Sequence, residues 1–272
     1  MKQRLRRHPV TTVTQSRAAI FAPTKLPTTT AAIVVVTTPW ATATLKKVQL
    51  TQIHRDILDV LFTHFVPHYR RDGSCVFVFA PYALMRHLGH RGGVNLEWLR
   101  EKFEDLRIVE LTIRSTAYTT STGIVRKHRR RNDGSQYVVI FESEYLTFFR
   151  RDLAVHSEAL TDRILALRSG ASKALVRFLL THSKWNKPLS ITVDYLGHLQ
   201  SKRAKQRAMA AIRSEGSALE QHFGIRIIDE RTVAYEKHRL VWFDGDARTL
   251  EKCESPKADS EAGAPFDRGP SC

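Results

Sequence analysis

Residues 171–223 read ASKALVRFLLTHSKWNKPLSITVDYLGHLQSKRAKQRAMAAIRSEGSALEQHF. The first part, ASKALVRFLLTHS, has apolar residues at the spacing of an amphipathic helix, and PLSI after it is typical of a short strand. TVDYLGHL predicts a second helix, and residues 201–223 predict a longer third helix. IRIID, TVAYEK and RLVWF, which follow, are rich in β-branched and aromatic residues and predict strands. The expected order is therefore helix, short strand, helix, helix and β-hairpin.

The same order occurs earlier in the chain. LTQIHRDILDVLFTHFV (50–66) has helical spacing with Thr51 as its expected N-cap, and CVFVFA (75–80) predicts a strand. PYALMRHLG (81–89) predicts a helix that begins at a proline and ends at a glycine. NLEWLREKFEDL (95–106) predicts a third helix, and IVELTIR, AYTTSTGIVRK and QYVVIF predict strands after it.

A helix-turn-helix with an appended β-hairpin is a winged helix, and its elements follow this order. We therefore expect an α+β chain with two tandem winged-helix domains, at residues 46–155 and 156–245. The alternative is one irregular α+β domain. Residues 1–45 contain six Arg and Lys and no acid in a Thr/Pro-rich segment, which predicts a disordered basic arm. Residues 246–272 predict a second disordered tail.

The charge balance indicates a polyanionic partner. The 272 residues carry a formal net charge of +16 at a pI near 10.1, and most of the excess lies within residues 46–245. Nucleic acid or an acidic membrane surface fits such a charge. An apolar fraction of 42% with 13 Phe excludes a wholly disordered chain.

The densest basic run is VRKHRRRNDGSQYVV (125–139). It lies between two strand-like segments with a turn signal, Asn-Asp-Gly, after the basic residues. This pattern favours the arm and tip of the first β-hairpin over a localisation peptide. The run is expected to bind phosphate through Arg126, Lys127, Arg129, Arg130 and Arg131. A smaller counterpart in the second copy is EKHR (236–239), with Lys237 and Arg239.

The third helix of the second copy is the strongest candidate for reading DNA bases. At about 100° per residue, Ala204, Ala208, Ala211 and Ile212 share one side. Arg or Lys can recognise guanine and Gln can recognise adenine in the major groove. The candidate contacts are Lys202, Arg203, Lys205, Gln206, Arg207 at an edge, and Arg213. The alternative is an ordinary solvated basic face.

The corresponding helix of the first copy is a weaker candidate. Arg91 and Asn95 lie at its start, but Glu97, Glu101, Glu104 and Asp105 would repel phosphate. This helix is expected to pack against a partner protein or a second subunit, so a homodimer is possible.

Catalytic and metal-binding signatures are missing from the sequence. There is no His-X-His pair, no GxxxxGK[ST] loop, no GxGxxG and no GxSxG. His64 and His68 have the spacing of helical zinc ligands, but Pro67 separates them and no HExxH glutamate is present. We therefore expect no enzyme activity, no cofactor and no metal.

The compartment follows from the cysteines and from hydropathy. Cys75, Cys253 and Cys272 form no metal or disulfide pattern, which favours a reducing, cytoplasmic environment. No stretch approaches the roughly 18 apolar residues that a membrane span needs. AAIVVV is too short and too late for a typical signal peptide, whereas the acid-free, Thr-rich start leaves an organelle transit peptide open.

Two segments carry a resemblance to a known family. APYALMRHLGHRGGVNLEWLREKFEDLR in the first copy, and ALVRFLLTHSKWNKPLSITVDYLGH followed by SKRAKQRAMAAIR in the second, resemble plasmid replication initiators of the tandem winged-helix, TrfA/RepA-like type. The resemblance covers roughly residues 46–245. It implies binding to repeated origin sites (iterons), melting of an AT-rich region, and recruitment of a host initiator, a replicative helicase and a sliding clamp. In this family the reading role would belong to Lys202, Arg203, Gln206 and Arg207.

Three functions remain open on the sequence. The first is a double-stranded DNA-binding replication initiator, and the second is a winged-helix transcriptional regulator. The third is an RNA-binding or scaffold protein. Competition between duplex DNA and RNA would distinguish it from the first two, because the grooves of A-form RNA do not admit a reading helix.

Overall fold

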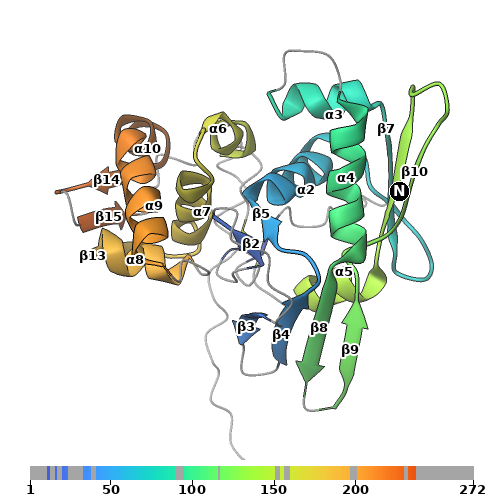
Figure 1. Ribbon diagram of the computed structural model, residues 1–272, viewed down its shortest axis with the longest axis horizontal. Helices are drawn as coiled ribbons and strands as arrows, with labels where there is room; N and C mark the ends of the chain where they lie inside the picture. Colours follow the sequence, from blue (N-terminus) through green and yellow to red (C-terminus); the bar gives the residue numbers. More distant parts are fainter. Residues whose placement is uncertain are drawn as a thin grey trace, which may run out of the picture. The chain divides into compact units, whose positions relative to one another are not determined.

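The computed structural model describes residues 11–12, 16, 20–23, 33–37, 41–89, 95–115, 117–150, 154–155, 160–196, 201–229 and 232–236 (Figure 1). The chain divides into two units, Met1–Val241 and Trp242–Cys272. All the described residues belong to the first unit. The expected tail at 246–272 lies outside them.

The described residues combine helices with small, mainly antiparallel sheets, which confirms the α+β class. The helices are α2 (Gln52–His64), α3 (Pro81–His87), α4 (Leu96–Ile108), α5 (Ser143–Arg150), α6 (Thr161–Ala166), α7 (Gly170–Leu179), α8 (Leu189–Tyr195), α9 (Lys202–Ser214) and α10 (Gly216–Phe223). The strands are β1 (Thr11–Thr12), β2 (Phe21–Ala22), β3 (Ile33–Thr37), β4 (Ala41–Lys46), β5 (Leu50–Thr51), β6 (His68–Tyr69), β7 (Cys75–Phe79), β8 (Glu110–Ser115), β9 (Thr119–Thr122), β10 (Val125–Arg130), β11 (Tyr137–Phe141), β12 (Ala154–Val155), β13 (Lys184–Pro188), β14 (Ile225–Ile227) and β15 (Thr232–Glu236).

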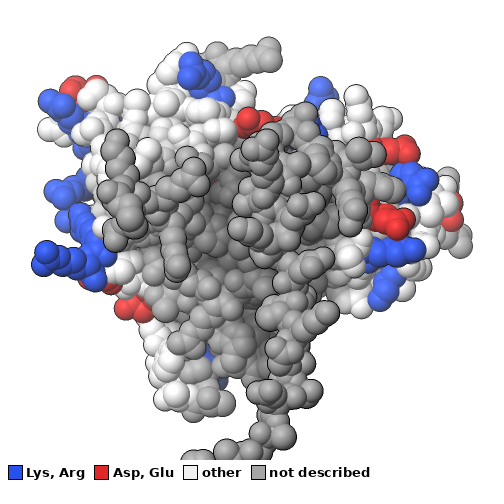
Figure 2. All heavy atoms as spheres, turned by 180° about the vertical axis from the view of Figure 1, so that it is seen from behind, with Lys and Arg blue, Asp and Glu red and all other residues white. Residues whose placement is uncertain are grey.

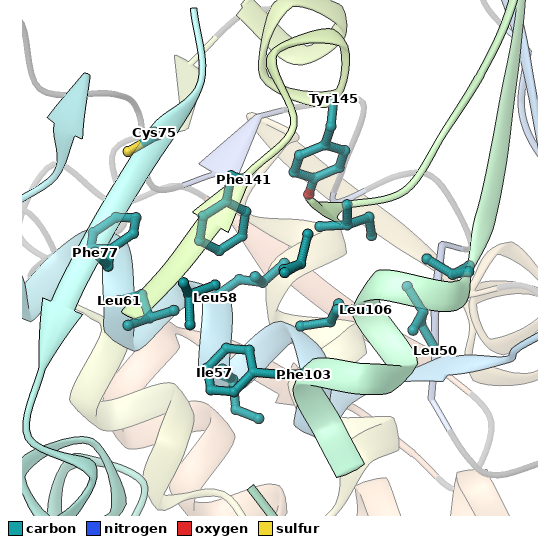
Figure 3. Close-up of a cluster of buried hydrophobic side chains, with 14 of the residues drawn as sticks. Leu50, Ile57, Leu58, Leu61, Cys75, Phe77, Phe103, Leu106, Phe141 and Tyr145 are labelled. Atoms are coloured by element: carbon teal, nitrogen blue, oxygen red, sulfur yellow. The ribbon is translucent and has the colours of Figure 1, made fainter. Parts of the chain in front are cut away.

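A first hydrophobic core joins α2, α4 and the sheet β10-β11-β7-β6. Figure 3 shows Ile57 and Leu61 of α2 facing Phe103 of α4, with Phe77 of β7 and Phe141 of β11 beside them. All five side chains are fully buried. The helical spacing read from the sequence puts these α2 and α4 residues on one face, so the core follows directly from the pattern.

A second hydrophobic core joins α7, α8, α9 and α10 to the sheet β13-β15-β14. Leu175 and Leu179 of α7 and Ile212 of α9 are fully buried in it. Trp185 of β13 packs on the same core, and its indole N–H donates to the Thr192 hydroxyl at 3.0 Å. This core contains none of the residues of the first, so each half of the chain has an apolar interior of its own.

The two halves share one strand topology. In the first, the strand between the first two helices, β7, pairs with the last strand, β11, whose other neighbour is β10. In the second, β13 pairs with β15, whose other neighbour is β14. Apart from β6, β8 and β9 in the first half and α10 in the second, the order helix, strand, helix, helix and two strands is present twice, as the sequence predicted. The domain boundaries at 155 and 245 stay a prediction.

Part of the segment expected to be a disordered arm is folded, so that expectation is wrong for these stretches. β4 pairs with β8 along all six residues, and β3 pairs with the other side of β4. β2 runs parallel to β5, and Ile20, Phe21 and Ala22 are buried. The prediction of disorder was wrong because it assumed that a Thr/Pro-rich composition cannot bury apolar surface. Its β-branched residues instead extend a sheet that β8 and β9 form after α4.

Two element boundaries in the second half also differ from expectation. The short strand is not PLSI but the preceding KWNKP, because β13 pairs with β15 along residues 184–188. Pro188 ends that strand at the N-cap of α8. The long helix expected over 201–223 is broken at Glu215, whose carboxylate accepts hydrogen bonds from the backbone N–H groups of Arg168 and Ser169. The Glu215 carboxylate therefore binds the backbone just before and at the N-cap of α7.

Gly170, the first residue of α7, has no room for a side chain. A Cβ at this position would overlap the carbonyl oxygen of Pro23. We expect Gly170→Ala to lower the free energy of unfolding by about 1–3 kcal/mol, because backbone must move to relieve the overlap. Chemical denaturation measures this change. Gly216→Ala is the matched control, since its Cβ would meet Ile227 Cδ1 at an ordinary 3.5 Å. Equal effects of the two substitutions would contradict the packing of residues 20–23 on α7.

Candidate nucleic-acid interface

Helix α9 has one buried and one basic face, as its sequence predicted. Ala208 and Ile212 are buried in the second core, whereas Lys202, Arg203, Gln206 and Arg207 are exposed. Ser201 caps the helix, and its hydroxyl accepts from the backbone N–H of Ala204 at 3.1 Å. The exposed cations thus follow a helix N-terminus, where free N–H groups and the helix dipole favour an anion.

The other two cations predicted on α9 differ from this group. Lys205 is partly buried and forms an ion pair with Asp194 of α8, with Nζ and Oδ2 2.6 Å apart. Its charge is therefore already compensated within the protein. Arg213 is exposed but lies in the last turn of α9, away from the Lys202 end.

A lysine that the sequence reasoning missed lies on β13. The Lys187 ammonium lies over the Trp185 ring at 5.0 Å and the Tyr195 ring at 5.5 Å from their centroids. Both cation and aromatic rings are common in nucleic-acid interfaces. The signal in the sequence was KWNK (184–187), two lysines around a tryptophan. We treat Lys187 as a further candidate contact because α8, which carries Tyr195, packs on α9.

The basic run of the first half forms one arm of a β-hairpin, as predicted. β10 pairs with β11 from Val125 to Arg130, and the backbone N–H of Arg131 donates to Gln136 O at 2.9 Å across the turn. Gly134 has φ 72°, a conformation that favours glycine. The Asn-Asp-Gly signal therefore marks the turn correctly.

The two faces of β10 differ in what they contact. His128 points toward α4, where Nε2 lies 3.1 Å from a Glu104 carboxylate oxygen and Nδ1 lies 3.0 Å from the Tyr137 hydroxyl. Because strand residues alternate between faces, Lys127 and Arg129 project from the opposite face. In register they lie beside Ile140 and Val138, and both are exposed.

The hairpin cations also differ in their ion pairs. Arg126 donates to Glu142 and to Asp72, both at 2.9 Å. These hydrogen bonds raise the pKa of Arg126 and use its charge internally. Arg131 lies 3.3 Å from Asp133 in the turn, and Arg130 acts on Glu97 of α4 through its charge. Lys127 and Arg129 are therefore the best candidates for an external anion. Figure 2 shows Lys and Arg side chains grouped at the edge where β10 lies.

Helix α4 is a poor anion site. Its basic residues pair with acids three positions away: Arg100 with Glu97, Lys102 with Asp105 and Arg107 with Glu104. The Arg100 hydrogen bond lowers the pKa of Glu97, so the carboxylate is charged at neutral pH. Asn95 is the N-cap, and its side-chain oxygen accepts from the backbone N–H of Trp98 at 2.8 Å. Arg91 lies outside the described residues.

The described hairpin of the second half is formed by β14 and β15, which pair from Ile225 to Tyr235. Of the predicted basic counterpart EKHR (236–239), Glu236 is the last residue of β15. Lys237 and Arg239, and the expected strand RLVWF, lie outside the described residues, so this part of the expectation stays a prediction.

In the part of the chain that the structure describes, we find no helix with the length and apolarity that a membrane span requires.

Comparison with known proteins identifies relatives in fold alone. The structure superimposes on a crystal structure of domains 2 and 3 of RctB with a TM-score of 0.56 at 14% identity, covering 82% of this chain and 98% of that one. A second structure of RctB domains 2–3, residues 155–483, gives a TM-score of 0.53 at 12% identity, covering 82% of this chain and 94% of that one. No family model and no curated protein matches the sequence. The fold described above is therefore similar to that of RctB domains 2–3.

Proposed function

We propose that this chain is a non-enzymatic, sequence-specific double-stranded DNA-binding protein that initiates plasmid replication at repeated origin sites. The observation that carries the proposal is α9. It is the third helix of a repeated unit and buries Ala208 and Ile212 while exposing Lys202, Arg203 and Gln206. A helix-turn-helix presents this helix to the major groove, where long donors read base edges.

The repeated strand topology supports a tandem winged-helix arrangement. In each half a hairpin comes after the third helix, with β8 and β9 between them in the first half and α10 in the second, and its last strand pairs with the strand between the first two helices. A winged helix appends its β-ribbon to the helix-turn-helix in this way. The fold neighbours give independent support for the role, because RctB is a replication initiator. The closer assignment to the TrfA/RepA-like type rests on the sequence resemblance.

The ion pairs indicate which elements contact the bases and which contact the phosphates. We assign base reading to α9 and phosphate binding to Lys127 and Arg129 of the β10–β11 hairpin. Helix α4, whose cations are compensated by its own acids, is left for contact with a partner protein or a second copy of the chain. A host initiator, a replicative helicase and a sliding clamp, all in a bacterial cytoplasm, are the partners that the proposal implies.

One experiment tests the proposal and its main alternative, a transcriptional regulator. Duplexes bound by the protein are selected from a random pool, and the resulting motif is searched for in the DNA that encodes the protein. Tandem copies spaced by whole helical turns beside an AT-rich tract support the initiator. A single copy at a promoter favours the regulator. Failure to enrich any motif, together with stronger binding to RNA than to duplex DNA, would overturn sequence-specific DNA binding.

Neutralising the hairpin tests phosphate binding. We expect Lys127→Ala with Arg129→Ala to weaken binding to specific and random duplexes alike. The slope of log affinity against log salt should decrease in magnitude by roughly 2, because each phosphate contact that is made releases about 0.9 counterions and two contacts are lost. Fluorescence anisotropy at salt concentrations between about 50 and 200 mM measures this slope. Arg126→Ala is the matched control on the same strand, since Asp72 and Glu142 already compensate that charge. A slope unchanged by the double substitution would refute the assignment.

A further inference from the structure

Three side chains with metal-binding atoms meet where three helix ends come together. His64 is the last residue of α2, His87 is the last residue of α3, and Asp162 lies in the first turn of α6. One ligand atom from each lies within 4.8 Å of the others. Among the described residues, these are the His, Cys, Asp or Glu side chains that gather in this way.

The three side chains already contact one another. His64 Nε2 lies 3.0 Å from Asp162 Oδ1, and the rings of His64 and His87 stack with centroids 4.0 Å apart and planes 12° apart. A second contact fixes the same junction, because the hydroxyls of Thr63 and Thr161 are 3.2 Å apart. This threonine contact links the ends of α2 and α6 independently of the histidines.

We propose that His64, His87 and Asp162 bind a divalent transition-metal ion, for which Zn²⁺ fits best. Imidazole nitrogen and carboxylate oxygen are both zinc ligands, at about 2.0–2.1 Å from the ion. Tetrahedral ligands at that distance are separated by roughly 3.4 Å. The existing separations, which do not exceed 4.8 Å, need to close by at most about 1.4 Å on this geometry, which rotation of the exposed Asp162 carboxylate and of the partly buried rings can supply.

The surroundings suit an ion. Asp162 is exposed, with 73% of its side chain accessible, so the site has an open side for entry and for a water as fourth ligand. The C-terminal end of α2, a helix of 13 residues, favours positive charge.

A metal here would link the two halves of the chain. His64 and His87 belong to helices of the first core, whereas α6 contributes Ile164 to the second core. The sequence reasoning missed the site because it considered His64 only with His68, four residues away. His68 instead lies on β6, an exposed position on a different element.

Direct titration tests the proposal. Tag-free protein, stripped with EDTA, is titrated with Zn²⁺ against a chromophoric chelator, and with Co²⁺ by visible absorption. We expect one ion per chain and the absorption of a four-coordinate Co²⁺ site. His87→Ala and Asp162→Asn should each weaken Zn²⁺ binding at least 10- to 100-fold. His68→Ala is the matched control and should bind like the parent protein.

A stability measurement separates loss of ligands from loss of fold. Asp162→Asn keeps an oxygen for the hydrogen bond to His64, so its melting temperature without metal should equal that of the parent chain. Added Zn²⁺ should raise the melting temperature of the parent and of His68→Ala, but not that of Asp162→Asn or His87→Ala. Absence of Zn²⁺ and Co²⁺ binding to the parent chain, or affinities unaltered by both ligand substitutions, would overturn the site.

Discussion

Arg177→Met is expected to destabilise the protein by about 3 kcal/mol, because it leaves buried carboxylates without their main cation. The Arg177 guanidinium, on α7, is 5% exposed and donates to Asp56 at 2.7 Å and to Asp59 at 2.8 Å on α2. It also donates to Gln52 Oε1 at 2.5 Å. Burial opposes the charge on Arg177, but Asp59 and Asp56 outweigh it and raise the pKa of the guanidinium. These contacts tie α2, which belongs to the first core, to α7, which belongs to the second.

The expected loss lies at the lower end of the range for broken buried pairs, about 3–5 kcal/mol, because two other cations remain. Lys173 Nζ lies 2.5 Å from Asp56, and Arg55 Nε lies 2.8 Å from Asp59. The midpoint and slope of urea denaturation measure the change. Arg163→Met, at an exposed position of α6, should stay within about 0.5 kcal/mol.

A conservative variant distinguishes charge from packing. Arg177→Lys keeps a positive charge near Asp56 and Asp59, so it should lose less stability than Arg177→Met. Equal losses from the two substitutions would assign the effect to side-chain packing and not to charge. A loss below about 1 kcal/mol for Arg177→Met would contradict the buried ion pairs.

Replacing Arg203 and Gln206 by Ala should reduce affinity for the selected DNA site roughly 30- to 20,000-fold, since two bidentate base contacts of about 1–3 kcal/mol each contribute about 2–6 kcal/mol together. Random duplex should lose about tenfold or less, because only one phosphate-binding charge is removed. Both side chains are exposed on α9 opposite the buried Ala208 and Ile212, so the substitutions leave the second core intact. Competition of labelled specific duplex with unlabelled random duplex measures the ratio.

The matched control is Arg100→Ala with Lys102→Ala on α4, the helix in the equivalent position of the first half. These cations pair with Glu97 and Asp105. Their removal should therefore change the affinity for specific DNA less than about threefold, the small effect expected for paired surface charges. Equal losses on specific and random DNA from the α9 variant would contradict base reading by α9. A larger loss from the α4 variant would transfer that role to α4.

Local patterns predicted most of the elements correctly. Thr51 is the N-cap of α2, Pro81 begins α3, and Gly89 follows α3 with φ 83°. These signals act over a few residues, through backbone hydrogen bonds and allowed dihedral angles, so one sequence suffices to find them. Strand assignment was less accurate where pairing decided it. KWNKP is a strand because β15 pairs with it, and the helix expected over 201–223 is divided at Glu215, whose carboxylate accepts a hydrogen bond from the backbone of Arg168, before α7.

The sequence predicted which faces of α9 and β10 are exposed, but it did not predict which of their cations are paired with acids of the same chain. Helical periodicity places Arg203 and Gln206 on the exposed side of α9, and alternation places Lys127 and Arg129 on one side of β10. Sequence spacing does not reveal that Arg126 pairs with Asp72, or that Lys205 pairs with Asp194. Those acids lie on other elements, and only the packed chain brings them within hydrogen-bonding distance.

The sequence by itself determined the two hydrophobic cores, the repeated order of elements and the basic faces of α9 and β10, because each depends on periodicity and turn chemistry within one segment. Tertiary structure decided the rest. It recruited residues 20–22 and 41–46 into the fold, buried Arg177 against Asp56 and Asp59, and gathered His64, His87 and Asp162. His64 and Asp162 are 98 positions apart in the chain, as are other partners at this junction. Contacts between such distant residues leave no local pattern, since they form only when whole elements pack together.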